Sequence, residues 1–101
     1  MITRENFKNL ILSLGFKENK NTFIKKYKAF DYEMSIDFDN EVLNYGNKVV
    51  VNDKTTSNFS HDENFVVFEC VNRLIETGYR PEDIELEPKW TLGHDAKGGK
   101  V

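Results

Sequence analysis

The sequence predicts a small α+β domain: an N-terminal helix, a small antiparallel β-meander, a long capped helix and a following strand. Apolar residues recur at helical spacing before residue 15 and after residue 60, and between these segments they alternate with polar residues. With 101 residues, 39% of them hydrophobic, the chain can bury one core and is too apolar for a disordered protein. We therefore expect a single domain over residues 1–101, with the helix and meander in 1–58 and the second helix and strand in 59–101.

The first helix is expected between Thr3, a suitable N-cap, and Gly15, which suits the left-handed residue that often follows a helix. Its apolar residues stand at positions i, i+3, i+4 and i+7, so they share one face. They are Phe7, Leu10, Ile11 and Leu14. We expect this face to pack on the rest of the domain.

Strands are expected in the middle of the chain, where apolar and polar residues alternate as they do in a half-buried strand. The turn pairs Asp39-Asn40 and Gly46-Asn47 allow the chain to reverse between them. The expected strand segments are 22–27, 32–38, 41–45 and 48–51. The pattern predicts an antiparallel meander of three or four strands, followed by a polar surface loop at 52–58.

The second helix is expected to follow Ser60, because Ser60-His61-Asp62-Glu63 matches a capping box in which Glu63 reaches back to the N-cap backbone. Gly78 is expected to end the helix, and Pro81 prevents it from resuming. The stripe expected to face the core is Val67, Cys70, Val71 and Leu74, widened by Phe68 and Ile75.

A strand is expected at residues 84–92, where Pro88 favours an edge or a bulge. If the next strand of the sheet is missing, this strand has an unpaired edge. We then expect that the edge frays or pairs with a second copy of the chain, which would make the protein self-associate.

Charge and composition limit the function classes. The net charge is −3, and residues 1–60 carry about +1 while residues 61–101 carry −4. A free-standing duplex binder normally has a basic excess, so most phosphate contacts would have to come from elsewhere. No apolar run is long enough to span a bilayer, and the start lacks a signal-peptide pattern, so no membrane partner is expected. The single cysteine, Cys70, fits a reducing cytoplasm.

Few residues suggest catalysis. Glu63 has two interpretations, a capping-box partner or a metal ligand at the mouth of a nuclease site. Glu69 lies six residues further, about 600° around a helix, so the two carboxylates do not share a face. His61 and His94 are the only histidines, and with one cysteine they give no zinc-site spacing. The acidic residues of the predicted hairpin, Asp37, Asp39 and Glu41, are expected to form a solvated face.

The segment Lys97-Gly98-Gly99-Lys100 has two interpretations as well. Its backbone N–H groups and the ammonium groups of Lys97 and Lys100 could hold a phosphate of DNA. The glycine and lysine spacing of a P-loop is absent, which favours a flexible connection between strands.

Several motifs together resemble the N-terminal region of type I restriction enzyme R subunits, the endonuclease and helicase subunits, and related restriction-modification proteins with an adenine-N6 methylase. They are Asn58-Phe59-Ser60, Glu63-Asn64-Phe65-Val66-Val67, Glu69-Cys70-Val71-Asn72-Arg73-Leu74, Gly78-Tyr79-x-Pro81, Ile84-Glu85-Leu86-Glu87, Trp90-x-Leu92-Gly93-His94 and Lys97-x-Gly99-Lys100. The likeness is detailed over residues 58–100, and residues 32–38 and 55–57 resemble the preceding segment of some members.

The resemblance implies a partial restriction-endonuclease-like core of the PD-(D/E)xK kind, truncated before its catalytic strand. Glu63 matches the early helix glutamate of the family, whereas the catalytic Asp and the Glu-x-Lys pair would follow Val101. The parent protein would cleave DNA with Mg²⁺, coupled to ATP-driven translocation, together with methylase and specificity subunits. The fragment itself needs no cofactor and is expected to be inactive, because Glu63 alone cannot hold Mg²⁺ for phosphodiester hydrolysis.

Two other hypotheses remain open. The chain could be a non-catalytic module that docks a protein or DNA within a restriction-modification complex, or a complete small protein with another role. An open reading frame that continues with Asp and Glu-x-Lys would favour the fragment of a type I site-specific deoxyribonuclease. A stop codon after Val101 would favour the small protein.

Overall fold

Helix α1, Arg4–Ser13, opens the domain at the predicted place. The computed structural model describes residues 2–52 and 54–86. The Asn6 side chain accepts a hydrogen bond from the Thr3 backbone N–H at 2.8 Å, and Gly15 follows the helix with φ of +101°. Phe7 and Ile11 are fully buried, while Leu10 and Leu14 are partly buried against the same core. The prediction for this helix is therefore confirmed.

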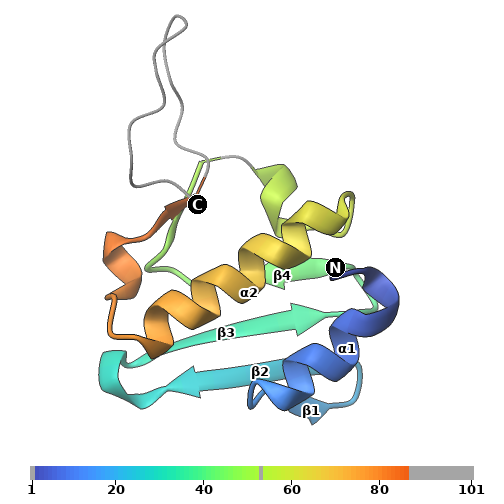
Figure 1. Ribbon diagram of the computed structural model, residues 1–101, viewed down its shortest axis with the longest axis horizontal. Coiled ribbons are helices and arrows are strands. Elements are labelled where there is room, and N and C mark those ends of the chain that lie inside the picture. The colour runs from blue at the N-terminus through green and yellow to red at the C-terminus, as the bar shows by residue number, and fades with distance from the viewer. Residues whose placement is uncertain (1, 53, 87–101) are drawn as a thin grey trace, which may run out of the picture.

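A four-stranded antiparallel sheet in the order β1-β2-β3-β4 follows. Its strands are β1 (Lys17–Asn19), β2 (Thr22–Tyr27), β3 (Tyr32–Asp37) and β4 (Val42–Asn44). Both helices lie over one face of this sheet (Figure 1), so the domain has two layers. The antiparallel meander is confirmed, but its fourth strand is β1 and not the predicted segment 48–51.

The segment expected as the last strand of the meander has another partner. Strand β5, Val50–Val51, pairs in parallel with β6, Glu85–Leu86. Parallel neighbours require a crossover connection, and here that connection contains the second helix. The Asn52 side chain strengthens the pair by donating to Glu85 Oε2 at 2.8 Å and to the Leu86 carbonyl at 3.1 Å.

Strand β5 occupies one edge of β6, and in the described two-stranded sheet the other edge of β6 has no strand partner, which agrees, for residues 85–86, with the unpaired edge predicted for a strand at 84–92. Self-association through this edge stays a prediction. The remainder of that predicted strand lies outside the described residues.

Helix α2, Asp62–Glu76, begins after His61, which is its N-cap and makes no side-chain capping bond. The predicted capping box from Ser60 to Glu63 is wrong. The Ser60 backbone N–H instead bonds to the Asn58 side-chain oxygen at 2.9 Å, so the chain around Ser60 forms a turn before the helix. Gly78, with φ of +111°, and Pro81, the first residue of the 3₁₀ turn η3 (Pro81–Asp83), follow the helix as predicted.

The buried stripe of α2 is rotated relative to the prediction. Val67 and Leu74 are only partly buried, and Cys70 is of intermediate exposure, so the expectation that Cys70 lies on a buried face is corrected. The residues that face the core are Asn64, Phe65, Phe68, Val71, Asn72 and Ile75. Two asparagines within this stripe obscured its position in the sequence, because polar residues usually mark the exposed face.

Aromatic rings fill the core between the sheet and the helices. The Phe7 ring centroid lies 4.6 Å from that of Phe65 and 6.1 Å from that of Phe68. Phe16 and Tyr45 contact Phe68 from other sides, at 5.8 and 5.1 Å. These contacts join α1, α2 and the segment after β4 into one hydrophobic cluster.

The segment predicted as a polar loop contains a short 3₁₀ turn, η2 (Lys54–Ser57), and Asn58 forms an isolated bridge with Val42 of β4. Buried Asn64 fixes this segment by donating to the Thr55 carbonyl at 2.8 Å and to the Asn58 carbonyl at 3.0 Å. The loop is thereby tethered to the first turn of α2. Neither α1 nor α2, the α-helices of the described part of the chain, is long and apolar enough to cross a membrane.

Candidate functional site

Glu63, the predicted metal ligand, lies exposed in the first turn of α2. Within residues 2–52 and 54–86, no group of three or more His, Cys, Asp or Glu side chains could hold a metal ion. Glu69, on the same helix, forms an ion pair with Arg73 at 2.9 Å. The described residues thus leave Glu63 without the further carboxylates that a nuclease metal site needs.

The predicted DNA-binding residues Lys97 and Lys100 and the loop residue His94 lie outside the described residues. His61 is the exposed N-cap of α2, in agreement with a surface residue at the helix start.

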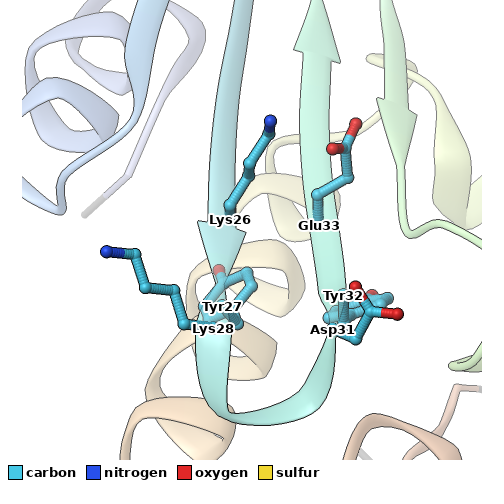
Figure 2. Close-up of a pocket in the computed structure, with 6 residues that line it drawn as sticks. All are labelled: Lys26, Tyr27, Lys28, Asp31, Tyr32 and Glu33. Carbon is cyan, nitrogen blue, oxygen red and sulfur yellow. The ribbon is translucent and has the colours of Figure 1, made fainter.

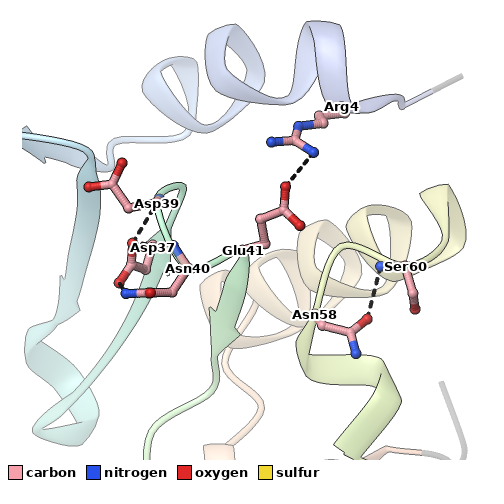
Figure 3. A network of polar contacts seen from close by, with 7 residues as sticks. All are labelled: Arg4, Asp37, Asp39, Asn40, Glu41, Asn58 and Ser60. Atoms are coloured by element: carbon pink, nitrogen blue, oxygen red, sulfur yellow. Dashed lines mark hydrogen bonds and ion pairs between the residues drawn. The ribbon is translucent and has the colours of Figure 1, made fainter.

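The acidic residues of the hairpin stabilise its turn (Figure 3). Asp37 accepts the backbone N–H groups of Asp39 at 2.9 Å and Asn40 at 3.1 Å, and the Asn40 side chain at 2.8 Å. These bonds, chiefly those from Asn40, lower the pKa of the Asp37 carboxyl below its ordinary value. Glu41 forms an ion pair with Arg4 of α1. Asp39 accepts a hydrogen bond from the Asn21 side chain at 2.9 Å, so each of these carboxylates has a structural partner.

Lys25 forms a polar network between the sheet and the helices, which was not predicted. Its ammonium group donates to the Leu14 carbonyl and to Asn72 Oδ1, both at 2.8 Å, and forms an ion pair with Glu76. The Lys25 side chain is only 12% exposed, whereas that of Glu76 is 52% exposed. The network ties the end of α1 and the strand β2 to α2, so we assign it a structural role.

Tyrosines extend this network into the core. The Tyr27 hydroxyl donates to Asn72 Oδ1 at 2.7 Å, and the Tyr32 hydroxyl donates to the Tyr45 carbonyl. Burial is the main cause that raises the pKa of Tyr27, Tyr32 and Tyr45 above the ordinary tyrosine value, and the nearby Glu76 adds to the shift at Tyr27. These hydroxyls therefore stay protonated at neutral pH and cannot act as bases there.

The end of the β2–β3 hairpin forms a hollow of about 400 Å³. Figure 2 shows Lys26 and Glu33 side by side on neighbouring strands, where they are cross-strand partners, while Lys28 points away from Asp31. Two lysines and two carboxylates line this hollow with Tyr27 and Tyr32. Its charges balance, so it does not select one sign of ligand.

A second hollow, of about 460 Å³, lies beside the β1–β2 hairpin, and we call it the β1–β2 hollow. Its lining residues are Gly15, Lys17, Glu18, Asn19, Ile24, Lys25, Lys26 and Lys28. Four lysines face one glutamate, so this surface is basic, in contrast to the net charge of −3 of the whole chain. The lysines were visible in the sequence, but their gathering depends on the pairing of β1 with β2, and β1 was not predicted.

Comparison with known proteins gives no relative: no family model, no curated protein and no solved structure matches this chain.

Proposed function

We propose that this chain is the N-terminal region of a restriction-modification protein similar to the type I R subunits, and that the residues after it perform Mg²⁺-dependent DNA cleavage coupled to ATP hydrolysis. The described residues then form a non-catalytic domain that leads into a nuclease core. One observation supports this proposal above the others. Helix α2 is followed by Gly78, Pro81 and strand β6, the helix-then-strand order that the resemblance implies.

Glu63 is the residue that we propose as the early metal ligand of the longer protein. Its side chain is exposed and does not serve as a capping partner, so the carboxylate is available to a ligand. Within residues 2–52 and 54–86 it belongs to no group of three or more possible metal ligands, which fits a site completed by later residues.

The first test uses the 101-residue chain with supercoiled plasmid and Mg²⁺. We expect no nicking, since the metal ligands and the lysine needed near the attacked phosphate are incomplete. Nicking that disappears in the Glu63→Ala variant would show that the domain is itself catalytic.

The second test uses the longer protein encoded by the reading frame. We expect Asp shortly after Val101, then Glu-x-Lys, and Mg²⁺-dependent cleavage that the Glu63→Gln variant loses. Asp62→Asn is the matched control, because Asp62 is also exposed in the first turn of α2 and its substitution removes the same charge. A stop codon at this point, or equal activity in both variants, would contradict the proposal.

A second candidate function is docking of a protein subunit or of DNA within such a complex. It is supported by the face of the sheet that points away from α1 and α2, where Lys26 and Glu33 project without a covering helix among the described residues (Figure 2). Ile24 lies two residues before Lys26 on the same strand and shares this face. Co-purification of the tagged chain with the methylase or specificity subunit encoded beside it tests this candidate. If neither subunit co-purifies with the tagged chain at low salt, a protein partner is contradicted.

A further inference from the structure

The charges of the chain are strongly segregated. Residues 17–28 contain five lysines and one glutamate, a net charge of +4, so the rest of the chain carries −7. The overall charge of −3 therefore hides a local basic segment. This segment forms β1, the turn after it, β2 and the start of the 3₁₀ turn η1, Lys28–Phe30.

The pairing of β1 with β2 brings part of this charge together. Lys17 lies opposite Ile24, and Lys26 is two residues further along the strand of Ile24. Lys17 and Lys26 therefore share the face of the sheet that no helix of the described residues covers. Lys28 follows at the end of β2, and all three line the β1–β2 hollow.

These three lysines differ from Lys25, the fourth lysine of the lining. Lys25 is held by Leu14, Asn72 and Glu76. Lys17, Lys26 and Lys28 are exposed, and none forms an ion pair within residues 2–52 and 54–86. Their ammonium groups are therefore able to donate hydrogen bonds to a ligand.

The kind of partner follows from the residue types. Lysine is depleted in protein–protein interfaces, whereas lysine–phosphate contacts dominate non-specific nucleic-acid binding. Single-stranded nucleic acid is usually held by stacking of bases on exposed aromatic rings. The described lining of the β1–β2 hollow contains no aromatic side chain, which favours the backbone of a duplex.

We propose that Lys17, Lys26 and Lys28 of the β1–β2 hollow bind the phosphate backbone of duplex DNA without reading its sequence. This inference rests on the second candidate function, for which it names the partner and the surface. It adds a DNA contact on the sheet face to the contacts predicted at Lys97 and Lys100, which lie outside the described residues.

The test measures binding of the 101-residue chain to a short fluorescein-labelled duplex by anisotropy, in EDTA so that no cleavage can occur. Three phosphate contacts predict a slope of log affinity against log salt of about −2.7, or about a 40-fold loss between about 50 and about 200 mM salt. The Lys17→Gln, Lys26→Gln, Lys28→Gln triple variant is expected to bind at least about tenfold more weakly at the lower salt concentration.

The matched control removes three positive charges elsewhere, by Lys8→Gln, Arg73→Gln and Arg80→Gln on α1, α2 and the residue before η3. This control is expected to bind within about twofold of the parent chain, since the affinity depends chiefly on the charges that contact phosphate. Circular dichroism and thermal unfolding of both variants check that the fold is kept.

Three results would overturn the inference: no binding by the parent chain at low salt, equal weakening in both triple variants, or binding to single strands, polyglutamate or phosphatidylserine vesicles as tight as to duplex DNA. Each of these results leaves the cleavage tests of the longer protein untouched. Conversely, a failure of those tests leaves the binding result standing, so the two proposals fail separately.

Discussion

Neighbouring lysines on β2 show how differently the two faces of the sheet use the same side chain. Lys25 points toward the helices, is 12% exposed and has three hydrogen-bonding or ionic partners. Lys26 points to the opposite face and is exposed. Because successive side chains of a strand alternate, one residue step separates a structural ammonium group from one that is free for a ligand.

The inner face also holds the apolar and phenolic side chains of the sheet. Phe23, Met34 and Ile36 are at most 1% exposed, and Tyr27 and Tyr32 are at most 6% exposed. The outer face carries the exposed Lys26 and Glu33 and the partly buried Ile24. We conclude that stability depends on the inner face, whereas recognition is open to the outer face.

The largest loss of stability is expected at alkaline pH, which acts on the tyrosines of the core. Tyr27, Tyr32 and Tyr45 have a pKa raised above the ordinary value of 10.0, chiefly by burial. The unfolded chain therefore releases protons first, so stability is full below pH 10.0 and falls as the pH rises above it toward the higher folded-state pKa. We expect the absorbance of tyrosinate and the loss of circular dichroism to rise together. Ionisation of all three in a chain that stays folded would contradict their burial.

The second-largest effect is expected from shortening a buried side chain of the inner face and comparing it with a neighbour on the outer face. Phe23→Ala is expected to lower the free energy of unfolding by about 3–5 kcal/mol, because the ring is fully buried. Ile24→Ala, one residue further on the outer face, is expected to cost about 1 kcal/mol or less, since its side chain is only partly buried. Urea unfolding of both variants gives the comparison. Equal losses would mean that the outer face is also covered.

The lysines themselves provide the third comparison. Lys25→Ala should cost about 2 kcal/mol, because it leaves the Leu14 carbonyl without this donor, while Glu76 can be rehydrated at its exposed position. Lys26→Ala should change stability by no more than about 0.5 kcal/mol. Thermal unfolding tests both, and a large loss in Lys26→Ala would remove the proposed free donor.

The smallest effect concerns the hairpin turn. The Asp37 pKa lies below its ordinary value of 3.8 because Asn40 and the backbone bond to the charged form. The stability that Asp37 contributes is therefore present above pH 3.8 and is lost as the pH falls through the folded-state pKa. We expect Asp37→Asn to be less stable than the parent chain at neutral pH and equal to it in strong acid. A difference in stability that persists in strong acid would mean that the substitution acts through the geometry of the turn and not through the charge of Asp37.

Local patterns predicted much of this fold. Helix α1, the alternation of β2 and β3, and the end of α2 at Gly78 each follow from a few neighbouring residues. Strand β1 could not be predicted, because Lys17, Glu18 and Asn19 are all exposed and have no alternation. Its strand character comes from backbone pairing with β2.

Competition between nearby partners explains two other differences. The Asn58 side-chain oxygen accepts the hydrogen bond of the Ser60 backbone N–H. In the capping box that Ser-x-x-Glu favours, this N–H would donate to the glutamate side chain. Val50 and Val51 pair with β6 and not with the four-stranded sheet, and β6 reaches them only after the chain has passed through α2. Such choices depend on the tertiary structure and not on the local sequence.

The candidate site was less predictable than the fold. Glu63 was named as a possible metal ligand from the sequence, and the resemblance gave it a matching family residue. Among the residues that the structure describes, it belongs to no group of three or more possible metal ligands and is not a capping partner. The lysine surface was not predicted, because the total charge of residues 1–60, about +1, averages out the local excess of +4 in residues 17–28.

The parallel pair of β5 and β6 has a practical consequence for handling the protein. Val49, Val50 and Val51 form a β-branched apolar run, and β6 is the strand partner of β5 in the described part of the chain. Without residues 85–86 this run would have two unpaired edges instead of one among the described strands, and exposed apolar edges seed intermolecular β-structure. We therefore expect a chain that ends before Glu85 to precipitate on concentration, because Glu85 and Leu86 help to keep the protein in solution.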